Sequence, residues 1–425
     1  MSGKSSAATA RRSIATTLRW RRKRRGRPAA VSSKRLRKSL PAISAGQDIV
    51  IVGAGIAGLT LALELARRGI GSTILERAHR LEEVGAGLQL SPNALRVLWR
   101  LGLGGVLNAV GTSAASVTLR DGRSGRRIAD VPVTADDGTP YLALHRADLQ
   151  GALLTKVVQT ELTSLRLDSA FSDLSLDGDR VRLRLHAAGG AQDLAAALVV
   201  GADGVGSAVA AGLGLQDPAP AEAVAWRATL RGDEQTAVSG GVEAWLGPRR
   251  HAVAYPISSG RRTNLVLIEP ASDAQDPDGL RRRFAGWDER LVAMIARSAG
   301  FTAWPLRTVV SDRVWRHLDD RVVLIGDAGH AMPPYAAQGA GMAIEDAAVL
   351  AASLAEAPDL YAALARYESE RRPRIDRLRR RVAFHQRVYH LPRPLSLGRD
   401  VVLALRKSDQ LRQDLAWLYD WRPPA

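Results

Sequence analysis

The sequence contains no cysteine among its 425 residues. This absence excludes disulfide bonds, thiolate metal sites and cysteine nucleophiles, and it is typical of proteins from a reducing compartment such as the cytoplasm. The eight histidines are scattered, and none lies at metal-ligand spacing with a carboxylate, so no metal site is predicted. No serine lies in a convincing Gly-x-Ser-x-Gly elbow, which argues against a hydrolase.

Long apolar runs are missing as well. No stretch of about eighteen uninterrupted apolar residues occurs, so the sequence predicts no membrane-spanning helix and no membrane partner. Hydrophobic residues make up 46% and charged residues 24% of the chain, which indicates a globular protein rather than a disordered or fibrous one. At about 150 residues per domain, the length suggests two or three domains.

Acidic residues are absent from residues 1–46, which contain fourteen Lys or Arg. The remaining chain carries 46 basic and 43 acidic residues, so the net charge of +17 belongs almost entirely to this arm. We expect residues 1–46 to form a basic, disordered extension. It is interpreted as a solvated leader or an upstream start-codon assignment, with a transit peptide or a nucleic-acid patch as the functional alternatives. Because the body is nearly neutral, a nucleic acid is not the expected partner.

A glycine-rich turn follows the first predicted strand, residues 48–52. Gly53-Ala54-Gly55-Ile56-Ala57-Gly58 leads into strong helix formers over 59–68, and a second strand over 72–75 ends at Glu76. The first glycine permits a tight turn, Gly55 lets the backbone approach a pyrophosphate, and Gly58 allows close packing of helix on strand. Glu76 is placed to accept hydrogen bonds from the hydroxyls of a ribose. This unit predicts a dinucleotide cofactor without separating FAD from NAD.

A second cradle of the same kind is predicted near residue 330. A buried strand over 321–325 ends in Gly326-Asp327-Ala328-Gly329-His330, followed by the turn Pro333-Pro334 and the loop 338–341. An amphipathic helix is then predicted from Met342. The later stretch 368–373, which ends in proline, predicts a helix kink or break, and the tail 391–421 predicts a helical cap.

Three motifs together resemble the group A flavoprotein monooxygenases, the single-component aromatic hydroxylases of the salicylate, 3-hydroxybenzoate and 6-hydroxynicotinate hydroxylase type. They are Gly53–Gly58, Gly201–Gly204 and Gly326–Pro334. The resemblance implies an α/β fold, with a Rossmann-like FAD-binding domain of the glutathione-reductase type, an inserted β-sheet substrate domain and C-terminal helices. The expected boundaries are 47–221 and 305–380 for the two parts of the FAD-binding domain, 222–304 for the substrate domain, and 381–425 for the helical segment.

The resemblance also implies the cofactors: bound FAD, NADH or NADPH as a transient reductant, and O2 as co-substrate. Asp327 is expected at the ribityl chain, the 339–342 backbone at the pyrimidine end of the flavin, and Arg146 near the phosphates or ribityl chain. The loop 85–93 is expected to meet the cofactor. The full set of expected cofactor-binding residues is Gly53, Gly55, Ala57, Gly58, Glu76, Arg77, Gly87, Arg146, Asp203, Asp327, Gly339, Ala340, Gly341 and Met342.

One position departs from the family pattern. The motif around Asp203 is usually followed by an arginine, and the matching residue here is Ala210. This change either weakens binding of the nicotinamide reductant or is local drift, and the sequence leaves both interpretations open.

A hairpin is expected to carry the substrate chemistry. Residues 251–256 and 263–268 alternate like strands around the turn 258–261, so His251 and Tyr255 share one face. They match a ring-contacting pair of the 6-hydroxynicotinate hydroxylase type, where a neutral histidine suits a base or proton relay beside a phenol. Trp226, Trp245 and Tyr335 are expected to line an apolar pocket beside the flavin. A structural histidine and ordinary core aromatics are the competing interpretations.

The resemblance therefore implies NAD(P)H-dependent hydroxylation of a small aromatic substrate, such as a hydroxybenzoate or a hydroxypyridine-like acid. A monooxygenase of a larger substrate (a polyketide hydroxylase or an epoxidase) and a flavin dehydrogenase without oxygen transfer share the motifs and stay open. The expected oligomeric state is a monomer or a homodimer.

Overall fold

The computed structural model describes residues 49–81, 87–187, 189–231, 238, 241–274 and 276–425. The predicted extension over 1–46, and residues 85–86 of the predicted cofactor loop, lie outside the described residues.

A six-stranded sheet contains the predicted dinucleotide unit. Its order is β18-β19-β12-β1-β2-β8, and all neighbours are parallel except β18 and β19. Its strands are β1 (Ile49–Val52), β2 (Ser72–Leu75), β8 (Thr163–Arg166), β12 (Leu198–Gly201), β18 (Arg316–His317) and β19 (Val322–Leu324). The inner strands are runs of Val, Ile and Leu buried on both faces, as a covered parallel sheet requires. The predicted strands near residues 50, 73 and 323 are confirmed.

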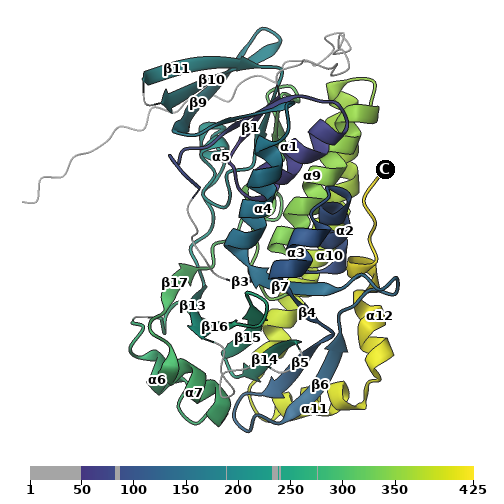
Figure 1. The fold of residues 1–425 in the computed structure, drawn as a ribbon. Helices are drawn as coiled ribbons and strands as arrows, with labels where there is room; N and C mark the ends of the chain where they lie inside the picture. The colour runs from purple at the N-terminus through teal and green to yellow at the C-terminus, as the bar shows by residue number, and fades with distance from the viewer. Residues whose placement is uncertain (1–48, 82–86, 188, 232–237, 239–240, 275) are drawn as a thin grey trace, which may run out of the picture. The chain divides into compact units, whose positions relative to one another are not determined.

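Different layers cover the two faces of this sheet (Figure 1). On one face, Ile49 and Ile51 pack into a core with helix α1 (Ile56–Arg67) and helix α9 (Gly339–Glu356). On the other face, Val50 and Val52 pack against a three-stranded antiparallel sheet. That sheet consists of β9 (Ser169–Asp177), β10 (Arg180–Ala187) and β11 (Gly190–Ala196).

A seven-stranded sheet forms the second part of the fold. Its order is β17-β13-β16-β15-β14-β5-β6, antiparallel except for β14 and β5. Its strands are β5 (Ser116–Asp121), β6 (Arg127–Pro132), β13 (Ala223–Arg231), β14 (Gly241–Gly247), β15 (Arg250–Ile257), β16 (Arg262–Pro270) and β17 (Thr302–Pro305). The predicted hairpin is the pair β15 and β16, with His251 opposite Ile268.

The seven-stranded sheet has two buried faces, because side chains alternate along each strand. One face packs on helices α6 (Leu280–Arg283) and α7 (Glu289–Arg297). The other face contributes Ala225, Tyr255 and Ile268 to the large core that also contains α1 and α9. The sheet is thereby joined to the dinucleotide unit through a shared core.

A small sheet and several helices complete the fold. A three-stranded sheet has the order β3-β7-β4. These elements are β3 (Gly87–Leu90), β4 (Thr112–Ala114), β7 (Tyr141–His145), α2 (Pro92–Arg100), α3 (Gly104–Val110), α4 (Arg146–Val158), α5 (Ala208–Gly212) and α8 (Asp327–His330).

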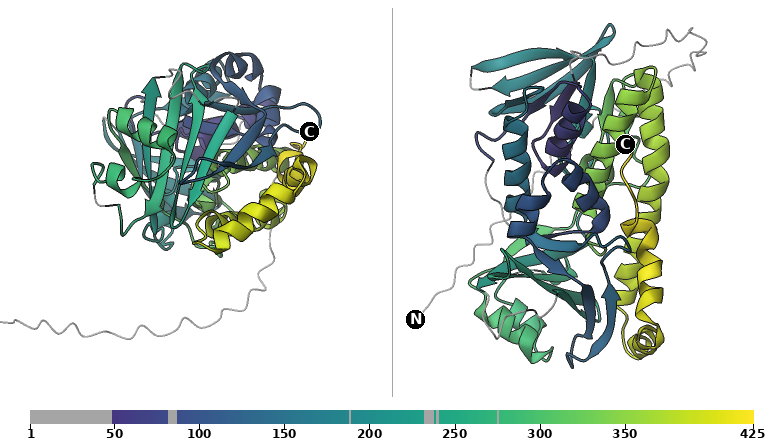
Figure 2. Two further views of the ribbon diagram at one scale, coloured as in Figure 1. Left: turned by 90° about the horizontal axis from the view of Figure 1, so that it is seen from below. Right: turned by 45° about the vertical axis from the view of Figure 1, so that its right-hand side comes forward.

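The C-terminal part is helical, as expected. It consists of α10 (Leu360–Tyr389), α11 (Leu395–Leu405) and α12 (Ser408–Tyr419). Helices α9 and α10 lie side by side (Figures 1 and 2). Of the kink or break predicted near Pro373, the break is wrong, since Pro373 lies inside the single helix α10, and the kink stays a prediction. The lost backbone hydrogen bond is outweighed there by the packing of α10 against α9 and by the ion pairs of Arg371, which is buried, and Arg374, which is partly buried.

The expected domain boundaries differ from the observed sheets in two places. Strands β5 and β6, within 116–132, belong to the seven-stranded sheet, although the boundary at 221/222 assigns them to the FAD-binding part. Pairing of β5 with β14 is a long-range contact that local periodicity does not reveal. Helix α10 also runs through the boundary at 380/381, because a continuous amphipathic face buries it on both sides of that point.

Within the described part of the chain, no helix is both long enough and apolar enough to span a membrane.

Candidate active site

The first turn has the close contacts that the glycine pattern predicts. Gly53 adopts φ +108°, and a Cβ there would lie 2.7 Å from the Ala202 carbonyl oxygen. A Cβ on Gly58 would lie 2.0 Å from the Gly53 carbonyl oxygen, so α1 can approach β1 only with glycine at this position. A Cβ on Gly55 would have its nearest neighbour 4.0 Å away, which leaves open space in front of the α1 N-terminus. The unpaired N–H groups of that terminus favour a phosphate.

Glu76 is fixed over this turn from the end of β2. Its carboxylate accepts hydrogen bonds from the backbone N–H of Ala54 at 2.9 Å and of Ala78 at 3.0 Å. The side chain is half-buried, and the neighbouring Arg77 is exposed. The acid is therefore held at the mouth of the turn, where the sequence places a ribose contact.

The second cradle opens onto the same region. A Cβ on Gly326, at the end of β19, would lie 3.3 Å from the Ala57 Cβ of α1 and 3.2 Å from the Ala343 Cβ of α9. The Asp327 side chain is exposed, and its Oδ1 lies 3.9 Å from the position of a Cβ on Gly339. Asp327 and the N-terminus of α9 thus border one space.

The backbone of α9 can donate only from its first residues. Gly339, Ala340 and Gly341 occupy the first turn, where N–H groups have no intrahelical partner. Met342 N–H donates to the Gln338 carbonyl oxygen at 2.8 Å, and the Met342 carbonyl oxygen accepts from Arg371 Nη2 at 3.3 Å. Both polar groups of the Met342 backbone are therefore used inside the protein, and the expectation that this backbone faces the cofactor stays a prediction.

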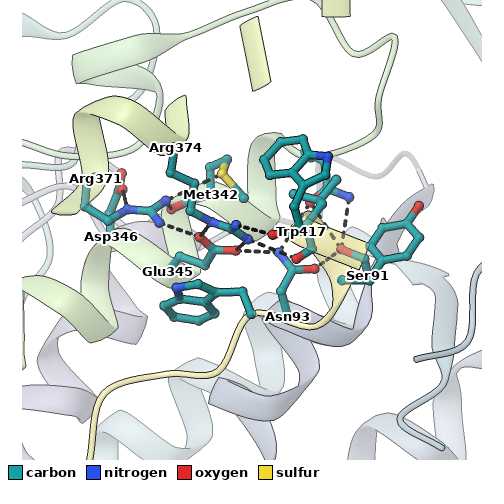
Figure 3. Close-up of polar contacts among 12 residues, drawn as sticks. Ser91, Asn93, Met342, Glu345, Asp346, Arg371, Arg374 and Trp417 are labelled. Atoms are coloured by element: carbon teal, nitrogen blue, oxygen red, sulfur yellow. Dashed lines mark hydrogen bonds and ion pairs between the residues drawn. The ribbon is translucent and has the colours of Figure 1, made fainter. Parts of the chain in front are cut away.

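A buried ionic network anchors α9 (Figure 3). Glu345 and Asp346 are fully buried and meet two arginines of α10. Arg371 Nε donates to Asp346 Oδ1 at 2.7 Å and a second nitrogen of Arg371 contacts Glu345, while Arg374 Nη2 donates to Glu345 Oε1 at 2.6 Å. His330 Nε2 lies 2.6 Å from Asp346 Oδ2, which also accepts from the Gly326 N–H at 2.8 Å. One carboxylate therefore holds both the residue before α8, Gly326, and the last residue of α8, His330.

The charges of this network are stable. Burial acts to raise the pKa of Asp346, but His330 and Arg371 outweigh it and lower that pKa to about 2. Burial likewise opposes ionisation of Glu345, and Arg371 with Arg374 lowers its pKa. Both carboxylates are ionised at neutral pH.

The network extends to the N-cap of α9 through amide side chains. Asn93 Nδ2 donates to Glu345 Oε1 at 2.6 Å, and Gln338 Nε2 donates to Ser91 Oγ at 3.0 Å. These side chains tie the start of α2 to the start of α9. The sequence analysis did not predict the network of Asn93, Glu345, Asp346 and Arg371. The available signal was the pair of adjacent acids, Glu345 and Asp346, inside a helix rich in Ala and Leu.

The seven-stranded sheet contributes Tyr255 near the first residues of β3. Gly87 N–H donates to Asn264 Oδ1 at 2.8 Å, and a Cβ on Gly87 would lie 2.7 Å from the Tyr255 ring. Gly87 is thus a close junction between β3 and the sheet, and the expectation that it binds the cofactor stays a prediction. Burial raises the pKa of Tyr255 to about 12, so the phenol stays protonated.

His251 lies on the same sheet face in a cluster of rings. Its centroid is 5.5 Å from Tyr335, 5.6 Å from Tyr389 and 5.1 Å from His390. Its Nδ1 lies 2.9 Å from His390 Nε2. Burial, helped by His390, lowers the pKa of His251 well below 6.5, so this imidazole is neutral at neutral pH. Tyr335 also lines a cavity of about 260 Å³ with Met332, Pro333 and Gln386.

Trp226 and Trp245 lie elsewhere, and the expectation that they line the substrate pocket is wrong. Both belong to the core between the seven-stranded sheet and helices α6 and α7. Trp226 Nε1 donates to Glu269 at 2.8 Å and Trp245 Nε1 donates to Asp288 at 2.5 Å. Strand alternation explains the difference, since residues at even positions of β13 face away from the face that carries Ala225.

The remaining expected residues lie beside the first turn or at the surface. Asp203 Oδ1 accepts from Ser207 Oγ at 2.5 Å and Oδ2 accepts from the Val209 N–H at 3.1 Å, while burial raises the pKa of this carboxyl. Arg146 is exposed at the start of α4. Ala210 is buried, and it borders a cavity of about 510 Å³ that Arg307 and Arg313 also line. Positive charge is thus present near the position where the family pattern has an arginine.

The arrangement fits FAD. Two strand–loop–helix cradles meet at Ala57 and Gly326, one with space for a pyrophosphate before α1 and the other with unpaired N–H groups at the start of α9. A dinucleotide that carries a flavin needs both kinds of site, because reduced flavin accumulates negative charge that helix N-termini stabilise. Among the described residues, no group of three or more potential metal ligands is present.

Comparison with known proteins gives the same assignment. A family model described as "FAD binding domain" matches residues 46–382. The 3-amino-4-hydroxybenzoate 2-monooxygenase of Streptomyces cremeus is 36% identical, over 87% of this chain and 94% of its own. The 3-hydroxybenzoate 6-hydroxylase 1 of Aquipseudomonas alcaligenes is 33% identical, over 88% of this chain and 97% of its own.

The fold has close counterparts among solved structures. Klebsiella pneumoniae HpxO, solved with FAD and uric acid, superposes with a TM-score of 0.77 at 25% identity, over 89% of this chain and 98% of its own. A salicylate hydroxylase substrate complex gives a TM-score of 0.73 at 21% identity, over 89% of this chain and 96% of its own. The chain therefore belongs to the FAD-binding domain family and is an FAD-dependent monooxygenase of the group A aromatic hydroxylase type, with NAD(P)H as reductant and O2 as co-substrate.

Proposed function

We propose that the protein hydroxylates a small aromatic acid that carries a phenol, at a site between the seven-stranded sheet and the N-terminus of α9. The observation that carries this proposal is the pairing of a neutral His251 with a protonated Tyr255 on the one sheet face that joins the core of the cofactor cradles. The names of the two bacterial relatives, which are hydroxylases of hydroxybenzoates, support this substrate class.

The proposed FAD site uses the two cradles. Glu76 and Arg77 bind the adenosine end, the α1 N-terminus binds the pyrophosphate, and Arg146 lies near the phosphates. Asp327 binds the ribityl chain, and the N–H groups of Gly339, Ala340 and Gly341 face the flavin pyrimidine. Asp203 positions the loop that supports Gly53. Bound FAD supplies reductive activation of O2 and transfer of one oxygen atom to the ring.

His251 is proposed to accept the phenol proton of the substrate, which makes the ring a better electron donor. A histidine that is neutral at neutral pH has a free ring nitrogen for this purpose. Tyr255 stays protonated and donates a hydrogen bond to an anionic substrate oxygen. Tyr335 provides an aromatic wall beside His251.

Arg227 supports an anionic substrate. It lies on β13 two residues from Ala225, and therefore on the same sheet face as Tyr255. Its Nε is buried without a hydrogen-bond partner among the described residues, and its guanidinium lies 5.3 Å from the centre of the Trp304 ring. Burial lowers the pKa of Arg227, and Tyr255 acts in the opposite direction. A substrate carboxylate would compensate this charge.

We place the protein in the cytoplasm, where the reduced nicotinamide substrate is available, as a monomer or a homodimer. Gel filtration with light scattering distinguishes the two oligomeric states.

A test of the function starts from the visible spectrum of the purified protein. NADH and NADPH oxidation is then measured with 3-amino-4-hydroxybenzoate, 3-hydroxybenzoate and 6-hydroxynicotinate under 18O2. We expect a flavin spectrum, oxidation stimulated by one of these acids, and one labelled oxygen atom in the product. Bound flavin with stimulated oxidation of NAD(P)H but no label in any organic product would contradict oxygen transfer and support the dehydrogenase alternative.

A further inference from the structure

We infer that His390 is the second member of a two-histidine relay that carries the substrate phenol proton from His251 toward the protein surface. This inference rests on the proposed function, in which His251 accepts that proton.

The geometry of the pair supports direct proton transfer. His251 lies on β15, and His390 follows the last residue of α10 as its C-cap. The contact of 2.9 Å joins His251 Nδ1 to His390 Nε2, which is hydrogen-bond distance between ring nitrogens. The relay uses the tautomer in which His251 Nδ1 donates this bond, and Nε2 of His251 is then the nitrogen left to accept a proton. His251 is 2% exposed, whereas His390 is only half-buried, so the pair runs from the interior outward.

The relay avoids a buried positive charge on His251. A proton that stayed on His251 would create a buried imidazolium, which burial strongly disfavours. In the relay, the O–H bond of the phenol breaks as a bond forms to His251 Nε2. The proton on His251 Nδ1 moves to His390 Nε2, and His390 releases its Nδ1 proton to water. His251 stays neutral throughout, and the reverse sequence returns a proton to the product oxygen.

Among the described residues, no carboxylate acts on the pKa of either histidine. Tyr335 and Tyr389 contact His251 with their rings, and burial raises the pKa of both phenols to about 12. Burial alone lowers the pKa of His390 to about 4. The backbone N–H of Arg249 donates to the His390 carbonyl oxygen, while the Arg249 side chain pairs with Asp273, and Arg381 lowers the pKa of the neighbouring His385. A proton that reaches His390 is therefore passed on to solvent rather than held.

The test compares His390→Gln with His385→Gln in the FAD-loaded protein. His385 is a matched control, because it is a half-buried histidine that stacks on Tyr389 at 5.1 Å and whose Nδ1 contacts the Tyr335 carbonyl oxygen at 2.9 Å. The hydroxylation rate at saturating 3-amino-4-hydroxybenzoate, or the panel acid that the wild type uses fastest, is measured from pH 6 to pH 9.5. Flavin content and melting temperature show that each variant is folded and loaded.

We expect His390→Gln to lose at least about tenfold in rate at pH 7, in line with general acid–base catalysis. The loss should shrink to less than about twofold toward pH 9.5, where phenols with a pKa near 10 begin to ionise in solution. Any loss of rate in His385→Gln should be the same fold-change at every pH. In His390→Ala, added imidazole should restore the rate at pH 7.

The outcomes are distinguishable from failure of the proposed function. If the wild type hydroxylates no panel acid, the proposed function fails. If the wild type hydroxylates an acid but His390→Gln has the same pH profile as the wild type, or imidazole does not rescue His390→Ala, the relay is wrong.

Discussion

Replacing Arg371 by methionine tests the buried network that anchors α9. Met matches the length and much of the volume of the arginine side chain but removes its charge and its donors. Arg371 is 1% exposed and serves two carboxylates that are themselves fully buried. In the variant, Glu345 keeps Arg374 and Asn93, while Asp346 keeps His330 and the Gly326 N–H.

The expected cost follows from the pKa of Asp346. Lowering this pKa from 3.8 to about 2 in the folded state corresponds to roughly 2 kcal/mol of folding free energy at pH 7, part of which comes from Arg371. Glu345 loses a partner as well. Removal of one partner from a buried ion pair typically costs about 3 to 5 kcal/mol, and we expect Arg371→Met to lower the free energy of unfolding by that amount.

Urea unfolding followed by tryptophan fluorescence measures this loss. The control is Arg366→Met on the same helix, because Arg366 pairs with Glu356 and Glu370 but all three side chains are about 40% exposed. It should change the free energy of unfolding by no more than about 1 kcal/mol. A loss in Arg371→Met no larger than in the control would refute the reasoning.

The pH dependence gives a second check. The folded-state pKa of Asp346 lies below its unfolded value, so its stabilising contribution is complete above that unfolded value and is lost as pH falls toward 2. Without Arg371 the two carboxylates protonate at higher pH and the unpaired charge disappears. The difference in the free energy of unfolding between wild type and Arg371→Met should therefore become smaller from pH 7 to pH 4. A difference that stays constant would indicate a packing effect alone.

Three further changes test separate parts of the site. Gly58→Ala places a Cβ 2.0 Å from a backbone oxygen and should weaken FAD binding at least about tenfold in a fluorescence titration, whereas Gly105→Ala, with no atom within 4 Å, should not. Arg227→Met should raise KM about tenfold more for a hydroxybenzoate than for the matching neutral amide, and equal effects would contradict carboxylate binding. Trp226→Phe should cost about 1 to 3 kcal/mol of stability through the lost bond to Glu269 and leave KM unchanged.

Local patterns were sufficient to predict the dinucleotide unit and the hairpin. Buried parallel strands leave uninterrupted β-branched runs, and the glycines at 53 and 58 are imposed by contacts only a few residues away in sequence. The hairpin was equally readable, because alternation and a turn lie within one short segment. These features depend on neighbours in the chain, which is why the sequence reveals them.

Features that depend on distant segments were missed or misassigned. Strand β5 joins the seven-stranded sheet by pairing with β14. Nothing in residues 116–121 themselves indicates this pairing partner. Trp226 was assigned to the pocket, but it is adjacent to Ala225 in β13, so the two side chains point to opposite faces of the sheet. Arg371, a partner of Glu345, lies on α10, and His390, the partner of His251, directly follows α10; both are too far along the chain for periodicity to predict the contact. Aromatic character alone does not tell a pocket wall from a core residue.

Helix α10 sets a fixed spacing within the molecule. It carries Arg371 and Arg374 at the network that holds the start of α9, and it ends beside His390 at the ring cluster of β15. At about 1.5 Å per residue, Arg374 and His390 lie roughly 24 Å apart along the helix axis. One residue inserted between them would turn the far end by about 100°. The length of the helix between Arg374 and His390 thus fixes the distance between the cofactor cradle and the substrate sheet. Insertions or deletions in this stretch should therefore be tolerated less well than substitutions.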